Sequence, residues 1–340
     1  MPEMTPERPA APGLAGMGGG AVLTEPAEPV EPIEAVEDGR VPSAEQLGVE
    51  ESHLSPRRLA LRRFSRHKLA MGSLFILIVL TALCVLAPLI TAHGYAYVPR
   101  GVQSIKLRLK GPSLAHPFGT DTIGRDQWSR VLYGGRVSLA VGLGVALSGT
   151  IIGTFVGSVA GFFGGRLDNF LMRITDLFLG MPLLVILILA SKAVGGSVLD
   201  IVLILSIFFW MPIARIVRGL FLSLKEKEYV EAARSMGASN FRIMFRHILP
   251  NCVGPIIVNA TLSVAGAILT ESVLSFLGRG VQPPVPTWGN LLDSGRRLQT
   301  IAPYLVWFPG LGILITVLCV NFVGDGLRDA LDPTQRRVRA

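Results

Sequence analysis

The 340-residue chain is half hydrophobic, with a mean hydropathy of +0.51, and only 16% of its residues are charged, against about 25% in soluble proteins. These values exclude an ordinary soluble domain. The net charge of +8 would suit a nucleic-acid partner, but Lys and Arg enrichment in cytoplasmic segments explains it more simply in a membrane protein, so we expect no nucleic acid.

The first 56 residues are rich in Pro, Ala, Gly and Glu and contain no Phe, Tyr or Trp. Such a segment cannot bury enough apolar surface to offset the entropy of ordering, so we predict a disordered, acidic cytoplasmic tail over residues 1–56. It lacks the basic start and apolar core of a signal peptide. An inert tail and a regulatory or docking segment are the alternative roles.

A basic block lies immediately before the first apolar run. Its members are Arg57, Arg58, Arg62, Arg63, Arg66 and Lys68. Basic residues next to a first span place the N-terminus in the cytoplasm. The same cluster is compatible with binding of anionic lipid headgroups, and the two interpretations do not conflict.

Six apolar runs are each long enough to cross a hydrocarbon core of ~30 Å as a helix. They extend from Leu69 to Thr91, Val137 to Phe163, Met172 to Ala193, Val198 to Val217, Pro250 to Gly278 and Ile301 to Val323. Pro182 is expected to kink the third run. An even number of spans puts both termini on one side, and the basic C-terminal end places that side in the cytoplasm. The prediction is an all-α, multi-pass protein of the cell (inner or plasma) membrane with about six transmembrane helices.

The runs divide the rest of the chain into predicted segments. These are residues 57–91, the basic flank and first transmembrane helix; 92–136, an extracytoplasmic loop; 137–323, the transmembrane core, which includes a charged loop at 223–250; and 324–340, a cytoplasmic tail. In the extracytoplasmic loop, Asp121, Arg125 and Asp126 lack a neighbouring third ligand, nucleophile or base. We therefore expect no catalysis or metal binding there.

Small and polar residues inside the runs predict helix contacts. In the second run, glycine recurs every four residues at Gly149, Gly153, Gly157 and Gly161. This pattern gives one small-residue face for close helix packing, either within the chain or against a second membrane subunit. Near the inner end of the fourth run, Arg215 and Arg218 can extend to the membrane interface.

The fifth run holds two polar residues, Asn259 and Glu271. A carboxylate within a span is costly, so Glu271 must face the protein interior, a partner or an aqueous path. Structural pairing is the simplest of these interpretations, and lining of a translocation path is the main alternative for both residues. A proton relay is poorly supported because Glu271 has no second titratable neighbour in the sequence.

The charged loop at 223–250 is predicted to form two short helices separated by a turn. On the first helix, the side chains of Tyr229, Ala232, Ala233 and Met236 share one face, flanked by Glu228, Glu231 and Arg234. Gly237 suits the left-handed cap that ends a helix, and Ser239 or Asn240 can begin another. Leu249-Pro250 is expected to end the second helix, with Pro250 in the first turn of the following span.

Three patterns in the chain resemble a known family. Glu231-Ala232-Ala233, Gly237 and Leu249-Pro250 resemble the EAA loop of ABC-importer permeases. His247 stands two residues before Leu249-Pro250, where isoleucine is usual. This variant resembles the dipeptide/oligopeptide/nickel subfamily, in particular its second (C-type) membrane subunit. The segments from Phe118 to Asp126 and from Leu274 to Asn290 are also similar to that subfamily, although Arg279 stands where an apolar residue is usual.

This resemblance implies a set of sites and partners. The coupling helix that docks on an ATPase would comprise Tyr229, Glu231, Ala232, Ala233, Met236, Gly237, Leu249 and Pro250. A loop facing the binding protein would contain Gln282, Pro283, Pro284 and Trp288. The implied partners are a homologous permease subunit, two ATPase subunits, an extracytoplasmic substrate-binding protein and membrane lipid. ATP and Mg would be bound by the ATPase subunits, with no cofactor in this chain.

The sequence contains no Walker A motif, no H-E-x-x-H, no G-x-S-x-G and no Cys/His cluster, so we expect a transport subunit rather than an enzyme. The function indicated is the permease of an ABC importer for di- or oligopeptides. A nickel-complex importer is the alternative that shares the same motifs. A standalone channel or secondary carrier is less favoured, because the sequence lacks inverted repeats and intramembrane ionisable pairs.

Overall fold

The computed structural model describes residues 56–331, so the predicted acidic tail, apart from Pro56, and the last basic residues lie outside the described part. Within residues 56–331 every regular element is helical, and the one β feature is an isolated bridge between Thr120 and Asp126. The elements are α1 (Pro56–Arg66), α2 (Lys68–Val85), α3 (Ala87–Ile90), α4 (Val102–Lys106), α5 (Gln127–Phe163), α6 (Gly165–Leu179), α7 (Leu183–Lys192), α8 (Val198–Leu224), α9 (Glu228–Ser235), α10 (Asn240–Arg242), the π-helix η1 (Ile243–Ile248), α11 (Leu249–Phe276), α12 (Trp288–Arg296) and α13 (Tyr304–Leu331). The predicted all-α class is confirmed.

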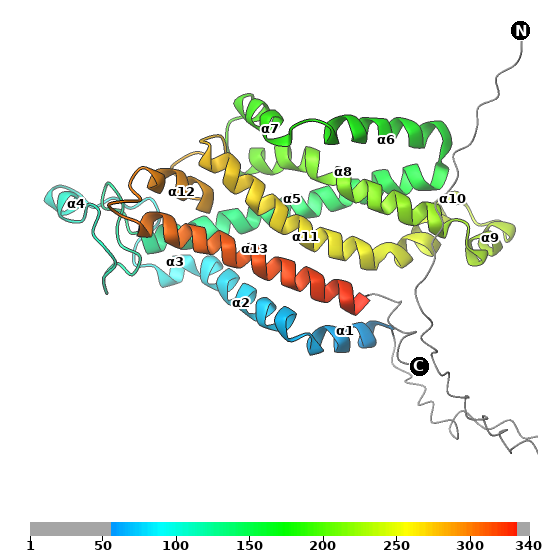
Figure 1. Cartoon of the computed structure of the whole chain (residues 1–340), viewed down its shortest axis with the longest axis horizontal. Coiled ribbons are helices and arrows are strands. Elements are labelled where there is room, and N and C mark those ends of the chain that lie inside the picture. Colours follow the sequence, from blue (N-terminus) through cyan, green and yellow to red (C-terminus); the bar gives the residue numbers. More distant parts are fainter. Residues whose placement is uncertain (1–55, 332–340) are drawn as a thin grey trace, which may run out of the picture. The chain divides into compact units, whose positions relative to one another are not determined.

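The long helices run along a common direction, and the short ones gather at two opposite ends (Figure 1). We refer to these as the α12 end, which also carries α4, and the α9 end, which also carries α10. In the middle, α5 packs along α8, while α11 packs against both α5 and α13. α1 and α2 cover the far side of α13.

The number of membrane-spanning helices agrees with the prediction. Within residues 56–331, five helices are long and apolar enough to cross a membrane, or six if the bent pair α6 and α7 forms one span. Several boundaries differ from the apolar runs, and two helices extend furthest beyond them. α5 begins at Gln127 rather than Val137, and α13 continues to Leu331, so the first part of the predicted C-terminal tail at 324–340 is helical.

The third span is broken rather than kinked. α6 ends at Leu179, α7 begins at Leu183, and the two axes differ by 87°. Pro182 has an extended backbone and precedes the first residue of α7. A proline offers no N–H for the helical ladder and disfavours helical geometry at the residue before it, which is Met181. The expected kink at Pro182 is therefore wrong: the helix stops and restarts in a new direction.

Leu249-Pro250 does not interrupt the chain's path, contrary to the prediction. Asn240–Phe276 forms one long stretch in which η1 joins α10 to α11 without a break. Pro250 does lie in the first turn of α11, as expected, where its missing N–H costs little. A π-helical turn of this kind is rare and is frequently found at functional sites.

The glycine face of α5 packs against α8 of the same chain. A Cβ atom at Gly153 would lie 2.5 Å from the carbonyl oxygen of Trp210, and one at Gly157 would press on the backbone of Ala214. A Cβ atom at Gly161 would meet the carbonyl of Arg218 at 2.7 Å. Of the two partners that the sequence left open for this face, the structure assigns it to α8.

Candidate functional site

The first helix of the charged loop ends as its sequence predicts. Gly237 has φ +79°, the left-handed conformation that glycine adopts without steric cost. The amide of Ala238 donates to the carbonyl of Ala233 at 3.1 Å, and the amide of Gly237 donates to the carbonyl of Arg234 at 3.0 Å. These two bonds form a Schellman motif, which turns the chain sharply after α9. Ser239 then caps α10 by accepting from the amide of Arg242.

The inward face of α9 contains Val230, which the prediction missed, and Ala233, which it placed on the docking face. Val230 and Ala233 are buried, at 0% and 2% exposure, in a cluster with Phe221 of α8 and Ile243 and Ile248 of η1. Ala233 is therefore part of the seat of α9 rather than of its exposed surface, and its role in docking stays a prediction. The spacing of Val230 and Ala233, three residues apart, was the signal for this face.

The outward face of α9 holds the other predicted docking residues. Tyr229 is 41% exposed and Met236 is 80% exposed, and Glu231, Ala232 and Gly237 are also exposed. Among the described residues Glu231 forms no ion pair. Loss of surrounding water raises the pKa of the Tyr229 phenol, so it stays neutral. The outward face thus combines apolar, small and acidic groups, of which the Tyr229 hydroxyl accepts a long hydrogen bond of 3.5 Å from the side-chain amide of Asn251.

The second half of the loop extends this exposed surface. Phe241 is 70% exposed and its ring lies 4.4 Å from the half-buried ring of Phe245. Of the two predicted docking residues here, Pro250 is exposed and Leu249 is half-buried. Large apolar groups left in contact with water on a projecting segment indicate a protein-binding surface. In Figure 1, α9 and α10 project beyond the long helices.

At the α12 end, Glu271 is fully buried and joins two helices. Its carboxylate accepts from the hydroxyls of Ser275 at 2.6 Å and Ser138 at 3.2 Å. Ser138 also accepts from the backbone amide of Trp288, so α5, α11 and α12 meet at this point. This arrangement supports structural pairing for Glu271. Asn259 is partly buried and donates to the carbonyl of Pro255 in its own helix.

In the loop before α12, three of the predicted binding-protein contacts are exposed and one is buried. Gln282, Pro283 and Pro284 are exposed, as expected. Trp288 is only 1% exposed, so it lies beneath this surface, and its role in docking stays a prediction. Its indole Nε1–H donates to the carbonyl of Val131 at 3.0 Å. The ring occupies space left by glycines, since a Cβ atom at Gly135 would lie 2.6 Å from it and one at Gly312 would lie 2.8 Å from it.

Asp121 organises the loop before α5. Its side chain accepts from the amides of Ile123 and Arg125 at 3.0 and 2.8 Å. It also accepts from the guanidinium of Arg125 at 2.6 Å and that of Arg130 at 2.8 Å. With four donors, the carboxylate is fully occupied in holding the loop on the start of α5. Asp126 caps α5 by accepting from the amide of Ser129.

Comparison with known families matches most of the chain. Residues 153–337 match the model of the binding-protein-dependent transport system inner membrane component. Residues 55–112 match the N-terminal TM domain of oligopeptide transport permease C. The first match covers the projecting α9 segment and the α12 end, and the second covers α1 and α2.

Curated relatives are similar over nearly their full length. The oligopeptide transport system permease protein OppC of Escherichia coli K12 is 43% identical over 277 residues, which cover 82% of this chain and 91% of the relative. The dipeptide transport system permease protein DppC of Bacillus subtilis 168 is 42% identical over 292 residues, 85% and 89% of the two chains. A putative peptide transport system permease protein of Brucella abortus is 43% identical over 279 residues, 82% and 92%.

Proposed function

The chain belongs to the binding-protein-dependent transport system inner membrane components, and we propose that it is the permease of an ABC importer for di- or oligopeptides. It is a membrane protein of five or six spans. The peptide cargo is supported by the relatives, which are named as oligopeptide and dipeptide permeases. These names favour peptides over the nickel complexes that share the sequence motifs.

The observation that carries this proposal is the projecting α9 segment. One side of α9 is fixed by Val230 and Ala233 on η1, while Tyr229, Ala232 and Met236 face outward. A helix held on one face and bare on the other can receive a force from a partner and pass it through η1 into α11. A standalone channel or carrier would have no use for such a segment.

The proposed assembly places ATPase subunits at the α9 end. The α9 end and both termini would then be cytoplasmic, and the α12 end would face the extracytoplasmic substrate-binding protein. A homologous permease would complete the path, with membrane lipid around it. ATP and Mg would be held by the two ATPase subunits, so hydrolysis takes place on separate chains.

The mechanism is a two-state equilibrium biased by two ligands. ATP closes the ATPase pair, α9 moves with it, and the spans change between inward- and outward-open arrangements. ATP and the loaded binding protein each shift this equilibrium only by their difference in affinity for the two states.

The proposal is tested by ATPase activity of the native complex, purified through this chain and placed in nanodiscs. A binding protein loaded with a dipeptide, a longer peptide or a nickel chelate is added in turn. Stimulation by a peptide-loaded binding protein is expected. Stimulation by the nickel chelate alone would overturn the peptide assignment, and absence of a co-purifying ATPase would overturn the importer assignment.

A further inference from the structure

The break between α6 and α7 leaves a small apolar pocket against α8. Its cavity volume is about 140 Å³, and its lining includes Phe178, Met181, Leu183, Phe208, Met211 and Pro212. Because an apolar cavity of about 150 Å³ can hold one benzene molecule, this space holds on the order of four to six heavy atoms. That is the size of one aliphatic side chain, and it is far too small for a whole peptide.

An exposed ion pair lies one helical turn from this pocket. Arg215 of α8 donates to the carboxylate of Asp176 in α6, and their side chains are 48% and 56% exposed. Asp176 is three residues before the pocket residue Leu179, and Arg215 is four residues after Met211. Residues at these spacings share a helix face, so the pocket and the ion pair open on the same side.

The ion pair indicates what this side of the chain faces. α8 is long and apolar enough to span a membrane, and α6 belongs to a span if it forms one with α7. A charged side chain is costly against lipid tails. A second pair, Asp168 with Arg218, is joined by a bond of 2.7 Å and has its carboxylate buried. Asp176 and Arg215 remain open, so their surface meets water or a polar molecule.

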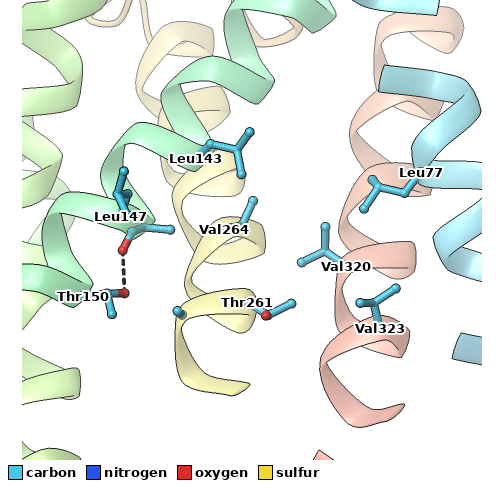
Figure 2. Close-up of a pocket in the computed structure, with 10 residues that line it drawn as sticks. Leu77, Leu143, Leu147, Thr150, Thr261, Val264, Val320 and Val323 are labelled. Carbon is cyan, nitrogen blue, oxygen red and sulfur yellow. Dashed lines mark hydrogen bonds between the residues drawn. The ribbon is translucent and has the colours of Figure 1, made fainter. Parts of the chain in front are cut away.

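A second groove, on the other side of the chain, differs from the pocket in its surroundings. It lies between α2, α5, α11 and α13, with a volume of about 350 Å³ (Figure 2). None of the described residues that line it is charged. Its Thr150 and Thr261 hydroxyls donate to carbonyls of their own helices, which leaves an apolar surface suited to lipid.

We propose that the pocket at the α6–α7 break receives an apolar side chain of the peptide in transit, while the Asp176–Arg215 pair contacts the peptide backbone and its charged termini. This inference rests on the proposed peptide-import function and adds a specificity-determining site to it. Met181 and Met211 line the pocket, and methionine adapts to differently shaped neighbours. Such a pocket favours a peptide with an apolar side chain at this position but does not require one.

The test fills the pocket and compares two peptides. Met181, which is 40% exposed, is replaced in Met181→Trp, and Leu183→Trp is a second variant at the other edge. Uptake of trialanine and trileucine is measured in proteoliposomes with the complete complex and its binding protein. We expect trileucine uptake to fall about 10-fold relative to trialanine, the scale on which apolar pockets discriminate.

Leu203→Trp is the matched control, because Leu203 is 56% exposed on α8 and lies outside the pocket lining. Binding-protein-stimulated ATPase activity shows that each variant is assembled. Equal uptake ratios in wild type and in both pocket variants would overturn the inference. Failure of the wild-type complex to import either peptide would instead overturn the proposed function, so the two failures are distinguishable.

Discussion

The two ends of the molecule are built in opposite ways. At the α12 end, Trp288 is enclosed by α5 and α13, and its side chain and backbone both donate to α5. At the α9 end, α9 is fixed mainly through Val230 and Ala233, and its outer face is bare. The difference shows which end is packed internally and which end leaves apolar side chains exposed.

The same contrast distinguishes a rigid α12 end from an α9 end that would transmit the movement of a partner. Glu271 ties α11 to α5 and α12 through buried hydroxyls, so the α12 end moves as one body. The α9 end is linked to the same α11 through the π-helical turn η1. The proposed coupling predicts that a displacement of α9 is passed along α11 toward the α12 end.

The largest expected effect is the loss of the rigid end. Trp288→Ala should lower the free energy of unfolding by about 3–5 kcal/mol, because it leaves a cavity and an unpaired carbonyl at Val131. Thermal unfolding of the purified complex measures this loss. Trp288→Phe keeps most of the ring and should cost less, about 1 kcal/mol from the lost hydrogen bond together with a small packing change. Wild-type stability in Trp288→Ala would contradict a rigid α12 end.

A second large effect is expected at the seat of α9. Ala233→Asp places a carboxylate among apolar side chains, and an uncompensated buried charge costs about 3 kcal/mol or more. α9 should detach while the spans stay inserted, so uptake stops and limited proteolysis cuts the loop at 223–250. The control is Ala232→Asp, which adds the same charge one residue away on the exposed face and should leave the loop resistant. Equal cleavage in both variants would refute the assigned faces.

An intermediate effect is expected at the turn after α9. Gly237→Ala forces a residue with a Cβ into the left-handed conformation, at about 1–2 kcal/mol. Gly237→Asn should cost less, because asparagine tolerates this conformation. Hydrogen exchange at the Ala238 amide, which donates to Ala233, reports the opening of the motif. Equal protection in the two variants would argue against backbone strain as the cause.

The smallest effect on stability is expected on the exposed loop before α12. Gln282→Arg should lower stability by about 1 kcal/mol or less, the scale of the hydrogen bond that the Gln282 side-chain amide donates to the carbonyl of Gly280. If the binding protein docks there, the concentration needed for half-maximal ATPase stimulation should rise several-fold. An unchanged titration curve would place the docking surface elsewhere.

Much of the fold follows from local sequence signals. Hydropathy gives the spans, and Gly237 gives the end of α9, because both depend on neighbouring residues alone. The break at Pro182 was expected as a kink because the same residue can produce either result. Which one occurs depends on whether nearby helices support the freed backbone, and at Met181 the chain leaves the helix altogether.

The contacts of single side chains were harder to predict. Trp288 lies in a loop pattern typical of a surface, and only its long-range fit against Gly135 and Gly312 shows that it is buried. Ala233 was predicted on the outward face of α9, because helical periodicity shows which residues share a face but not whether that face is buried or exposed. The ion pair of Asp176 with Arg215 joins two residues that are 39 positions apart in sequence, so no local pattern could predict it.

The central claim is that the outward face of α9 binds an ATPase, and Met236→Arg tests it most directly. Met236 is 80% exposed, so the variant should fold and insert normally. The measurement is binding-protein-stimulated ATPase activity of the complex purified through this chain, with Leu61→Arg, on the exposed face of α1, as the control. The account predicts loss of co-purifying ATPase or of its stimulation in Met236→Arg alone. Wild-type yield and stimulation in that variant would contradict it.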